Sequence, residues 1–140
     1  MLKHMVLQKE ITFPAFKKGY HLITHLIERE IEPLPKTGLV NIFIKHTSAG
    51  LSLNENADSS VRNDFENFFN KLIPENHPVY SHLSEGGDDM PAHIKSSLFG
   101  AQISIPVTNG RLNLGVWQGI YLCEFRRNGG PRTLIVTIYY

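Results

Sequence analysis

Residues 102–140 read QISIPVTNGRLNLGVWQGIYLCEFRRNGGPRTLIVTIYY, and this stretch sets the fold class because it has the pattern of β-strands throughout. An alternating run at 103–107 leads into Asn109-Gly110, a pair typical of a two-residue hairpin turn. Three further alternating or apolar runs follow, at 112–116, 120–124 and 133–140. Short turns between such runs predict a largely antiparallel sheet in the C-terminal part of the chain.

Towards the N-terminus, the chain switches between strand and helix periodicity. Alternating residues predict strands at 5–13, 39–46 and 49–55. Apolar residues at helical spacing predict helices over 19–30, from the N-cap Asp58 to Pro74, and from Pro91 to about Leu98. The irregular segment 74–90 is long for a loop, and loops of that length are usually functional or disordered. We therefore expect one α+β domain over 1–140, a largely antiparallel sheet or sandwich of about six to eight strands with two or three helices.

Composition and charge exclude several classes of function. The chain has 140 residues, 14 Lys and Arg against 13 Asp and Glu, and a formal net charge of +1. This balance argues against binding of nucleic acid or of a membrane surface, and no apolar run approaches the ~20 residues that span a bilayer. The single cysteine, Cys123, cannot form an intrachain disulfide and favours a reducing compartment. We expect a cytoplasmic protein.

His46 is the first candidate for chemistry, because it ends the strand predicted at 39–46 on the apolar face of that strand. A polar side chain there has to find a hydrogen-bond partner or line a cavity, since unpaired burial costs about 1–3 kcal/mol. His46 is therefore either a core histidine bonded to a backbone carbonyl or part of a pocket rim. Small polar residues after it fit a rim, although a loop between strands is polar in any case; they are Thr47, Ser48, Asn54, Glu55, Asn56 and Asp58.

The segment 82–95, HLSEGGDDMPAHIK, is the second candidate. It places two histidines, three carboxylates and a lysine at the start of a predicted helix. Asp89 and His93 are four residues apart and share one helical face. The N-terminus of a helix attracts anions, but acids at that position repel a phosphate unless a divalent cation bridges them. The segment therefore suggests a divalent metal together with a phosphate, with Mg²⁺ on carboxylates or Zn²⁺ on histidines. The alternative is a helix cap whose acids complement the helix dipole and whose histidines are solvated.

Two further features lie in the C-terminal strands. The glycine-rich run 110–119 is typical of a bulge or of close backbone approach to a ligand, with Trp117 and Gln118 presented there. A kinked strand with Trp117 in the core is the alternative. Glu124 has the same parity as the apolar residues of its strand, so we expect it to point inward, where a carboxylate needs an arginine, a histidine or a metal.

Taken together, these segments resemble the YjbQ family, whose members are often called secondary thiamine-phosphate synthases. The resemblance covers essentially the whole chain in the family's order. It rests on His46-Thr47-Ser48-Ala49, 54–58 (NENAD), Arg62 with Asp64, 87–95 (GDDMPAHIK), Pro106, Gly110-Arg111 and 115–120 (GVWQGI). It implies an α+β subunit that assembles as a homotrimer, and a weak ability to join a hydroxymethylpyrimidine pyrophosphate to a thiazole phosphate.

The resemblance also implies which residues form the site. Together with the motifs above, it predicts that four acids act in catalysis: Asp88, Asp89, Glu55 and Glu124. Substrate or phosphate is expected on Ser48, Asn54, Arg62, Lys95, Trp117 and Gln118, and a divalent metal, Mg or Zn, on His46, His82 and His93. Two positions depart from the family pattern: Val116 replaces a threonine, and Phe125 follows Glu124 where the family often has a histidine.

Three functions fit these residues. The first is a metal-assisted transferase in which Mg²⁺ on Asp88 or Asp89, helped by Lys95 and Arg62, neutralises the departing pyrophosphate. The second is a metal-dependent phosphate hydrolase with zinc on the three histidines. The third is a non-catalytic trimer that binds a small anion. The expected partners are other copies of the chain and a small phosphorylated metabolite, with a site that lies within one subunit or between two.

Overall fold

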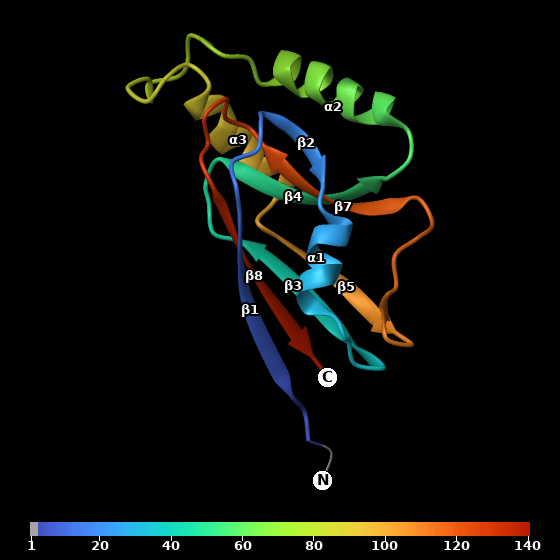
Figure 1. The fold of residues 1–140 in the computed structure, drawn as a ribbon. Helices are drawn as coiled ribbons and strands as arrows, with labels where there is room; N and C mark the ends of the chain where they lie inside the picture. The colour runs from blue at the N-terminus through green and yellow to red at the C-terminus, as the bar shows by residue number, and fades with distance from the viewer. Residues whose placement is uncertain (1–2) are drawn as a thin grey trace.

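The computed structural model of the chain describes residues 3–140, which form eight strands and three helices (Figure 1). The strands are β1 (Val6–Phe13), β2 (Gly19–Leu22), β3 (Thr37–Ile44), β4 (Ala49–Glu55), β5 (Gln102–Thr108), β6 (Arg111–Leu112), β7 (Gln118–Glu124) and β8 (Arg132–Tyr139). The helices are α1 (Thr24–Ile31), α2 (Ser59–Leu72) and α3 (Asp89–Phe99). Every strand pairing among the described residues is antiparallel, so the predicted α+β fold with a largely antiparallel sheet is confirmed.

The strands divide between two sheets. Five of them pair in the order β1-β8-β3-β5-β6, and three pair in the order β2-β7-β4. β7 and β8 follow each other in the sequence but lie in different sheets, so the turn between them carries the chain from one sheet to the other. This crossing brings Glu124, the last residue of β7, next to Arg132, the first residue of β8.

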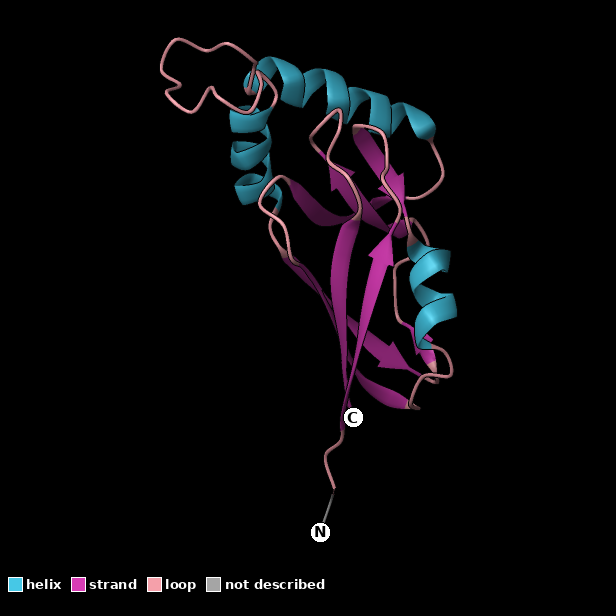
Figure 2. Ribbon diagram, turned by 60° about the vertical axis from the view of Figure 1, so that its left-hand side comes forward, coloured by secondary structure: helices cyan, strands magenta, loops and turns pink. Residues whose placement is uncertain are grey.

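The three-stranded sheet is covered on both faces, and this explains the burial of β7. Ile120 and Leu122 pack in the apolar core between the two sheets, which also contains the buried face of α1. Tyr121 and Cys123 face the other way, into an aromatic cluster beneath α2 and α3. Figure 2 shows α2 across one end of the molecule and α3 beside the strands at that end. A strand covered on both faces needs apolar residues at successive positions, and β7 has them.

The hairpin predicted at Asn109-Gly110 is present, but its second strand is short. The two turn residues have φ angles of 51° and 76°, as a type I′ turn requires. β6 ends at Leu112, so the strand predicted over 112–116 is wrong beyond its first residue. The Gly115 N–H donates to Oε1 of Gln118 and not to a neighbouring strand. The chain leaves the five-stranded sheet here in order to enter β7.

The helix predicted over 19–30 is wrong for its first residues. Gly19–Leu22 form β2, which pairs with β7, and α1 begins only at Thr24. Within α1, Ile27 and Ile31 form the buried stripe at helical spacing. Four residues are too few to show a period of two, and the partner strand lies far along the chain, so local periodicity cannot reveal β2.

α2 begins and ends where the sequence predicts. The Asp58 side chain accepts a hydrogen bond from the Ser60 N–H at 2.9 Å, and the helix ends before Pro74. Its apolar stripe is only partly covered, because no residue of α2 is fully buried and Phe68 and Leu72 are 60% and 57% exposed. Among residues 3–140, no helix has the length and apolar character that crossing a bilayer requires.

Candidate metal centre

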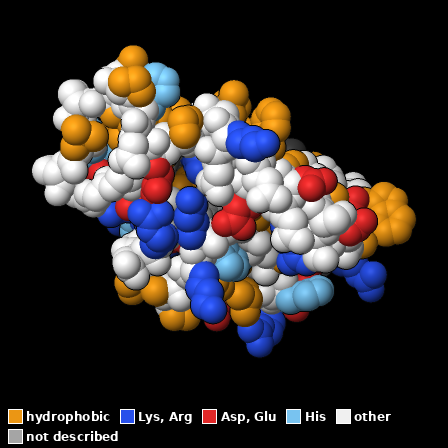
Figure 3. Space-filling view, turned by 90° about the horizontal axis from the view of Figure 1, so that it is seen from above, with side chains coloured by type: hydrophobic (Ala, Val, Ile, Leu, Met, Phe, Trp, Pro, Cys, Tyr) orange, Lys and Arg blue, Asp and Glu red, His pale blue; other side chains and the backbone are white. Residues whose placement is uncertain are grey.

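Four side chains with metal-binding groups meet at the start of α3. His82 and Glu85 come from the loop before the helix, and Asp89 and His93 project from its first two turns. One ligand atom of each residue lies within 4.8 Å of the ligand atoms of the other three. We call these four residues the His/acid cluster. Figure 3 shows acidic, basic and histidine side chains close together at this end of the molecule.

Asp89 lies at the centre of the His/acid cluster. Its side chain is 3% exposed, and Oδ2 lies 2.7 Å from His82 Nε2 and 3.1 Å from His93 Nε2. Oδ1 accepts a hydrogen bond from Arg126. Burial alone would raise the pKa of Asp89, but Glu85, His82 and the other partners lower that pKa below its ordinary value. Asp89 is therefore ionised at neutral pH and able to bind a cation.

The orientation of His93 leaves one ring nitrogen available as a ligand. Nδ1 lies 2.9 Å from the carbonyl oxygen of Thr47, which can only accept, so Nδ1 carries the proton. In the neutral ring, Nε2 then has a lone pair that faces a second acceptor, Asp89 Oδ2, across 3.1 Å. A proton or a metal ion between these two acceptors removes their repulsion. Metal-binding histidines are commonly oriented by such a bond from the outer nitrogen to a backbone carbonyl.

The donor set of the His/acid cluster suits a zinc-type ion better than magnesium. It offers two imidazoles and two carboxylates. Zinc is commonly bound by this combination, whereas Mg²⁺ prefers oxygen ligands and retains water. His82, Asp89 and His93 are therefore suited to hold a divalent metal, with Glu85 beside them at the solvent edge.

Asp88 does not join the His/acid cluster, because two arginines occupy its carboxylate. Oδ2 accepts a hydrogen bond from the Arg127 N–H at 2.9 Å and lies 3.3 Å from Arg126 Nε. Burial by itself would raise the pKa of Asp88, but these neighbours lower that pKa below its ordinary value. Asp88 stands at the N-cap position of α3 without a side-chain capping bond. Its carboxylate therefore contacts the arginines and does not cap the helix.

Glu124 points inward, as its parity predicts, and its partner is Arg132. Both side chains are buried, with 2.6 Å from Arg132 Nε to Glu124 Oε2 and 2.5 Å from Nη2 to Oε1. Nη2 also donates to Ser48 Oγ at 3.0 Å. Ser48 directly follows Thr47, so the buried pair supports the loop whose carbonyl orients the cluster histidine. Gly129 closes over the pair, because a Cβ there would lie 2.5 Å from atoms of both partners.

His46 lies outside the His/acid cluster. Its Nε2 accepts a hydrogen bond from the backbone N–H of Thr133 at 2.8 Å, so that nitrogen is not available to a metal. Burial, followed by the positive charge of Arg132, lowers the pKa of His46 below its ordinary value. Of the two interpretations that the sequence leaves open, the histidine bonded to the backbone fits this geometry in part: the partner is a backbone N–H and not the predicted carbonyl, and the ring is only half-buried.

Several of the predicted residues lie at the opposite end of the β4–β7 ladder. β4 runs from Ala49, paired with Glu124, to Glu55, paired with Gln118. The seven residues of β4 separate these ends by about 20 Å at the usual rise per residue. We call this opposite end the far end; it holds Asn54, Glu55, Arg62, Trp117 and Gln118. One chain thus contains two separate groups of predicted site residues.

At the far end, polar side chains mainly bind nearby backbone. Asn54 Oδ1 accepts from the Glu55 N–H at 2.8 Å, and Gln118 Oε1 accepts from the Gly115 N–H at 2.8 Å. Trp117 is 62% exposed, so its interpretation as a core residue is wrong. The far end contributes no member to the one group of potential metal ligands found among residues 3–140.

Lys95 lies on a different face of α3 from His93. Its side chain is buried, and Nζ donates to Asn70 Oδ1 of α2 at 2.7 Å. Burial, together with the nearby Lys18, lowers the pKa of Lys95 to about 8. Lys95 and Asp88 line a cavity from which all four residues of the His/acid cluster are absent.

Three arginines contact the predicted acids, and the sequence does not predict these contacts. Arg126 reaches Asp89, Arg127 reaches Asp88, and Arg132 reaches Glu124. The available signals are the two consecutive arginines at 126–127, separated from the end of β7 by one residue, and the need of an inward-pointing carboxylate for a cation. Neither signal says which acid each arginine meets, because each pair depends on how distant segments fold together.

Comparison with known proteins gives the same family as the resemblance. The sequence pattern of the family described as "UPF0047 protein YjbQ-like" matches residues 9–140. UPF0047 protein YjbQ of Salmonella typhimurium is 50% identical over 133 residues, which cover 94% of this chain and 96% of that protein. UPF0047 protein YugU of Bacillus subtilis is 46% identical over 112 residues, which cover 76% and 80% of the two chains.

Solved structures agree in fold. A conserved hypothetical protein from Thermus thermophilus matches with a TM-score of 0.81 at 34% identity, covering 91% of this chain and 97% of that one. A YjbQ/UPF0047 family protein from Clostridium acetobutylicum matches with a TM-score of 0.83 at 34% identity, covering 93% and 98%. The names of these relatives state no reaction. Since the family pattern and a half-identical relative both extend over nearly the whole sequence, the chain belongs to the YjbQ-like UPF0047 family.

Proposed function

We propose that this protein is a metal-dependent enzyme that acts on a small phosphorylated metabolite. The observation that carries the proposal is the His/acid cluster, in which His82, Asp89 and His93 converge beside Arg126. This arrangement places a cation site next to a guanidinium group, and both groups favour phosphate or pyrophosphate. It assigns the central role among the predicted acids to Asp89.

The residues of the cluster have distinct roles in this proposal. His82, Asp89 and His93 hold the metal, and the Thr47 carbonyl keeps His93 turned towards it. When bound, the metal supplies positive charge that neutralises a leaving phosphate group or makes water a stronger nucleophile. Glu85, whose side chain is 63% exposed, is placed to accept a proton from an attacking group.

The family resemblance supports transfer as the reaction. The hydroxymethylpyrimidine carbon forms a bond to the nitrogen of a thiazole phosphate while its bond to the pyrophosphate oxygen breaks. Pyrophosphate is already a good leaving group, so the protein mainly has to neutralise its charge. Arg126 lies between Asp88 and Asp89 and offsets part of their negative charge, which lowers the repulsion that a phosphate group meets here.

Hydrolysis of a phosphate ester is the second candidate, and the two imidazoles of the cluster favour it. Sites with histidine ligands and an open position are typical of zinc enzymes that activate water. In that case a single phosphorylated substrate suffices, and Glu85 takes the proton of the attacking water.

Metal binding and turnover by the Asp89→Asn variant test the proposal. Protein stripped with a chelator is titrated with Zn²⁺, Mn²⁺ or Mg²⁺, and then supplied with the pyrimidine pyrophosphate and the thiazole phosphate, or with a phosphate ester alone. We expect zinc affinity to fall by about 10-fold or more in Asp89→Asn, and turnover to be lost. Asp64→Asn, which changes an exposed acid of α2, is the matched control.

The outcomes separate the possibilities. Equal zinc affinity in Asp89→Asn and the wild type would overturn the metal site. Formation of thiamine phosphate identifies the transferase, whereas release of phosphate from an ester alone identifies the hydrolase.

We also propose that the chain forms a homotrimer in which the far end of one subunit acts beside the His/acid cluster of the next. About 20 Å within one chain is too far for a single small substrate to span. The exposure of Val116 and Trp117, at 78% and 62%, leaves the far end accessible to a neighbouring subunit.

Mixed assemblies test this sharing of sites. Asp89→Asn and Arg62→Met are each expected to be inactive alone. When the two variants are unfolded, mixed and refolded, some interfaces combine an intact cluster with an intact Arg62, so part of the activity should return. A mixture as inactive as its components would contradict a shared site.

A further inference from the structure

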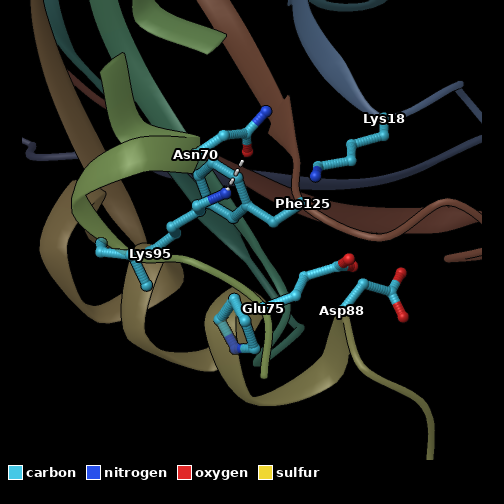
Figure 4. A pocket seen from close by; sticks show the side chains of 8 residues that line it. Lys18, Asn70, Glu75, Asp88, Lys95 and Phe125 are labelled. Atoms are coloured by element: carbon cyan, nitrogen blue, oxygen red, sulfur yellow. Dashed lines mark hydrogen bonds between the residues drawn. The ribbon is translucent and has the colours of Figure 1, made fainter. Parts of the chain in front are cut away.

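A cavity of about 230 Å³ lies between α2 and α3, lined by residues outside the His/acid cluster. Figure 4 shows Lys95 and Lys18 on opposite sides of it, and Phe125 also lines it. The polar wall is completed by Asn70, Glu75 and Asp88. The cavity is smaller than the roughly 300–1,000 Å³ usual for drug-sized ligands, so its natural occupant is small.

Lys95 is short of hydrogen-bond acceptors in this cavity. The residue is 3% exposed, and an ammonium group has three donors to satisfy. Its one protein acceptor among residues 3–140 is Asn70 Oδ1, at 2.7 Å, and within those residues no carboxylate oxygen lies within 4.0 Å of Nζ. A buried charge is costly unless an opposite charge accompanies it, so this ammonium group calls for an anion.

The two acids of the cavity do not supply that anion, because arginines already neutralise them. Glu75 Oε1 accepts from Arg127 Nη1 at 2.5 Å. Asp88 Oδ2 accepts from the Arg127 N–H at 2.9 Å and lies 3.3 Å from Arg126 Nε. Lys18, like Lys95, forms no ion pair within the described part of the chain. Among residues 3–140, the lysines of the cavity wall therefore lack a direct ion-pair partner, and only the more distant Glu66 and Glu75 raise the pKa of Lys95 against the effect of burial.

We propose that this cavity is a binding site for a small oxyanion, a phosphate or carboxylate group, held between Lys95 and Lys18. Phosphate and carboxylate oxygens both accept charge-assisted hydrogen bonds from ammonium groups. Phe125 provides an apolar surface for the carbon skeleton of a small metabolite that carries such a group. The site does not require the metal, so it stands or falls separately from the proposed function.

Calorimetric titration of chelator-treated protein with inorganic phosphate, and separately with acetate, tests the site. We expect saturable binding of at least one of the two anions by the wild type, and the tighter of the two identifies the preferred chemistry. Lys95→Met should weaken that binding by about 10-fold or more, since it removes a hydrogen bond to a charged group. Because the protein is chelator-treated, this binding does not depend on the metal centre, and Asp64→Asn, which changes an exposed acid of α2, should bind the anion as the wild type does.

Lys18→Met and Lys17→Met form a matched pair for the same titration. Lys18 lines the cavity, whereas the adjacent Lys17 is exposed to solvent. Lys18→Met should weaken anion binding while Lys17→Met leaves it unchanged, and this comparison holds even if Lys95→Met fails to fold. Equal binding by Lys18→Met and Lys17→Met, or no saturable binding of either anion by the wild type, would overturn the proposal.

Discussion

Glu124 and Arg132 form a buried charge pair, and removing either partner should strongly lower the stability of the fold. Their side chains are 0% and 3% exposed. Removing one partner leaves an uncompensated buried charge, which typically costs about 3–5 kcal/mol. We expect Glu124→Leu and Arg132→Met each to lower the free energy of unfolding by about that amount in urea titrations. The double variant should lose less than the sum of the two, and strictly additive losses would contradict the pairing.

His46 gives the stability of the fold a dependence on pH. It accepts the Thr133 N–H through Nε2 only while that nitrogen is unprotonated. Burial, followed by the charge of Arg132, lowers the pKa of His46 below its reference value of 6.5. As the pH falls, the unfolded chain therefore binds the proton first. The contribution of His46 is complete above about pH 6.5, and it is lost progressively from there down to the folded-state pKa.

His46→Gln tests this pH dependence, because an amide oxygen can accept the same hydrogen bond without titrating. Urea midpoints measured from about pH 8 to pH 5 should fall more steeply for the wild type than for the variant. Parallel curves would show that other groups set the dependence.

Among the elements, α2 depends strongly on its N-terminal cap. The helix has no fully buried residue, so packing holds it less firmly than a core helix. The Asp58 side chain binds the Ser60 N–H, and Asp58→Ala removes that bond. Asp58→Ala should lower the thermal unfolding midpoint, followed by circular dichroism, more than Asp58→Asn, which retains an acceptor. Equal losses in the two variants would contradict the capping role.

The elements also show which parts of a fold can be read locally. The sequence predicts α2 because its apolar stripe repeats along 14 residues, and β8 because most of its eight residues are β-branched or aromatic. It does not predict β2 or the true length of β6, because these strands have four and two residues and exist only through their partners. Pairing across a sheet overrides the local pattern in such short segments.

In the molecule as a whole, the outer face of the five-stranded sheet is open and carries exposed apolar side chains among polar ones such as Gln8, Asn41 and Thr137. Val6, Tyr139 and Leu39 lie in register across β1, β8 and β3, and Phe43 continues the row along β3. These four side chains are 39–56% exposed. Large apolar side chains this exposed on an open sheet face suggest a surface that another protein covers.

We therefore expect the protein to assemble in solution as the proposed trimer. Light scattering of the purified protein should report three times the 15.9 kDa of one chain. Phe43→Asp, which places a charge on the open face, should shift the mass towards that of one chain if this face is covered. A wild-type mass equal to that of one chain would contradict the assembly.

The α+β class, the antiparallel hairpins and the family follow from the amino-acid sequence alone, because periodicity, turn pairs and motifs are local properties of the chain. The sequence also places Asp89 and His93 on one helical face, since a spacing of four is enough for that. Tertiary structure was needed to show that His82 and Glu85 join them, while His46 and Glu124 turn to backbone and arginine partners.

Local sequence also does not show which charged residues contact one another around the site. Arg126 contacts Asp89, which is 37 residues away in the sequence, and Arg132 donates to Ser48, which is 84 residues away. Such contacts depend on the order of strands in two sheets and on a turn that passes between them. Local spacing does not determine that order. The candidate site residues could therefore be named from the sequence, but their separation into two groups at opposite ends of the β4–β7 ladder could not.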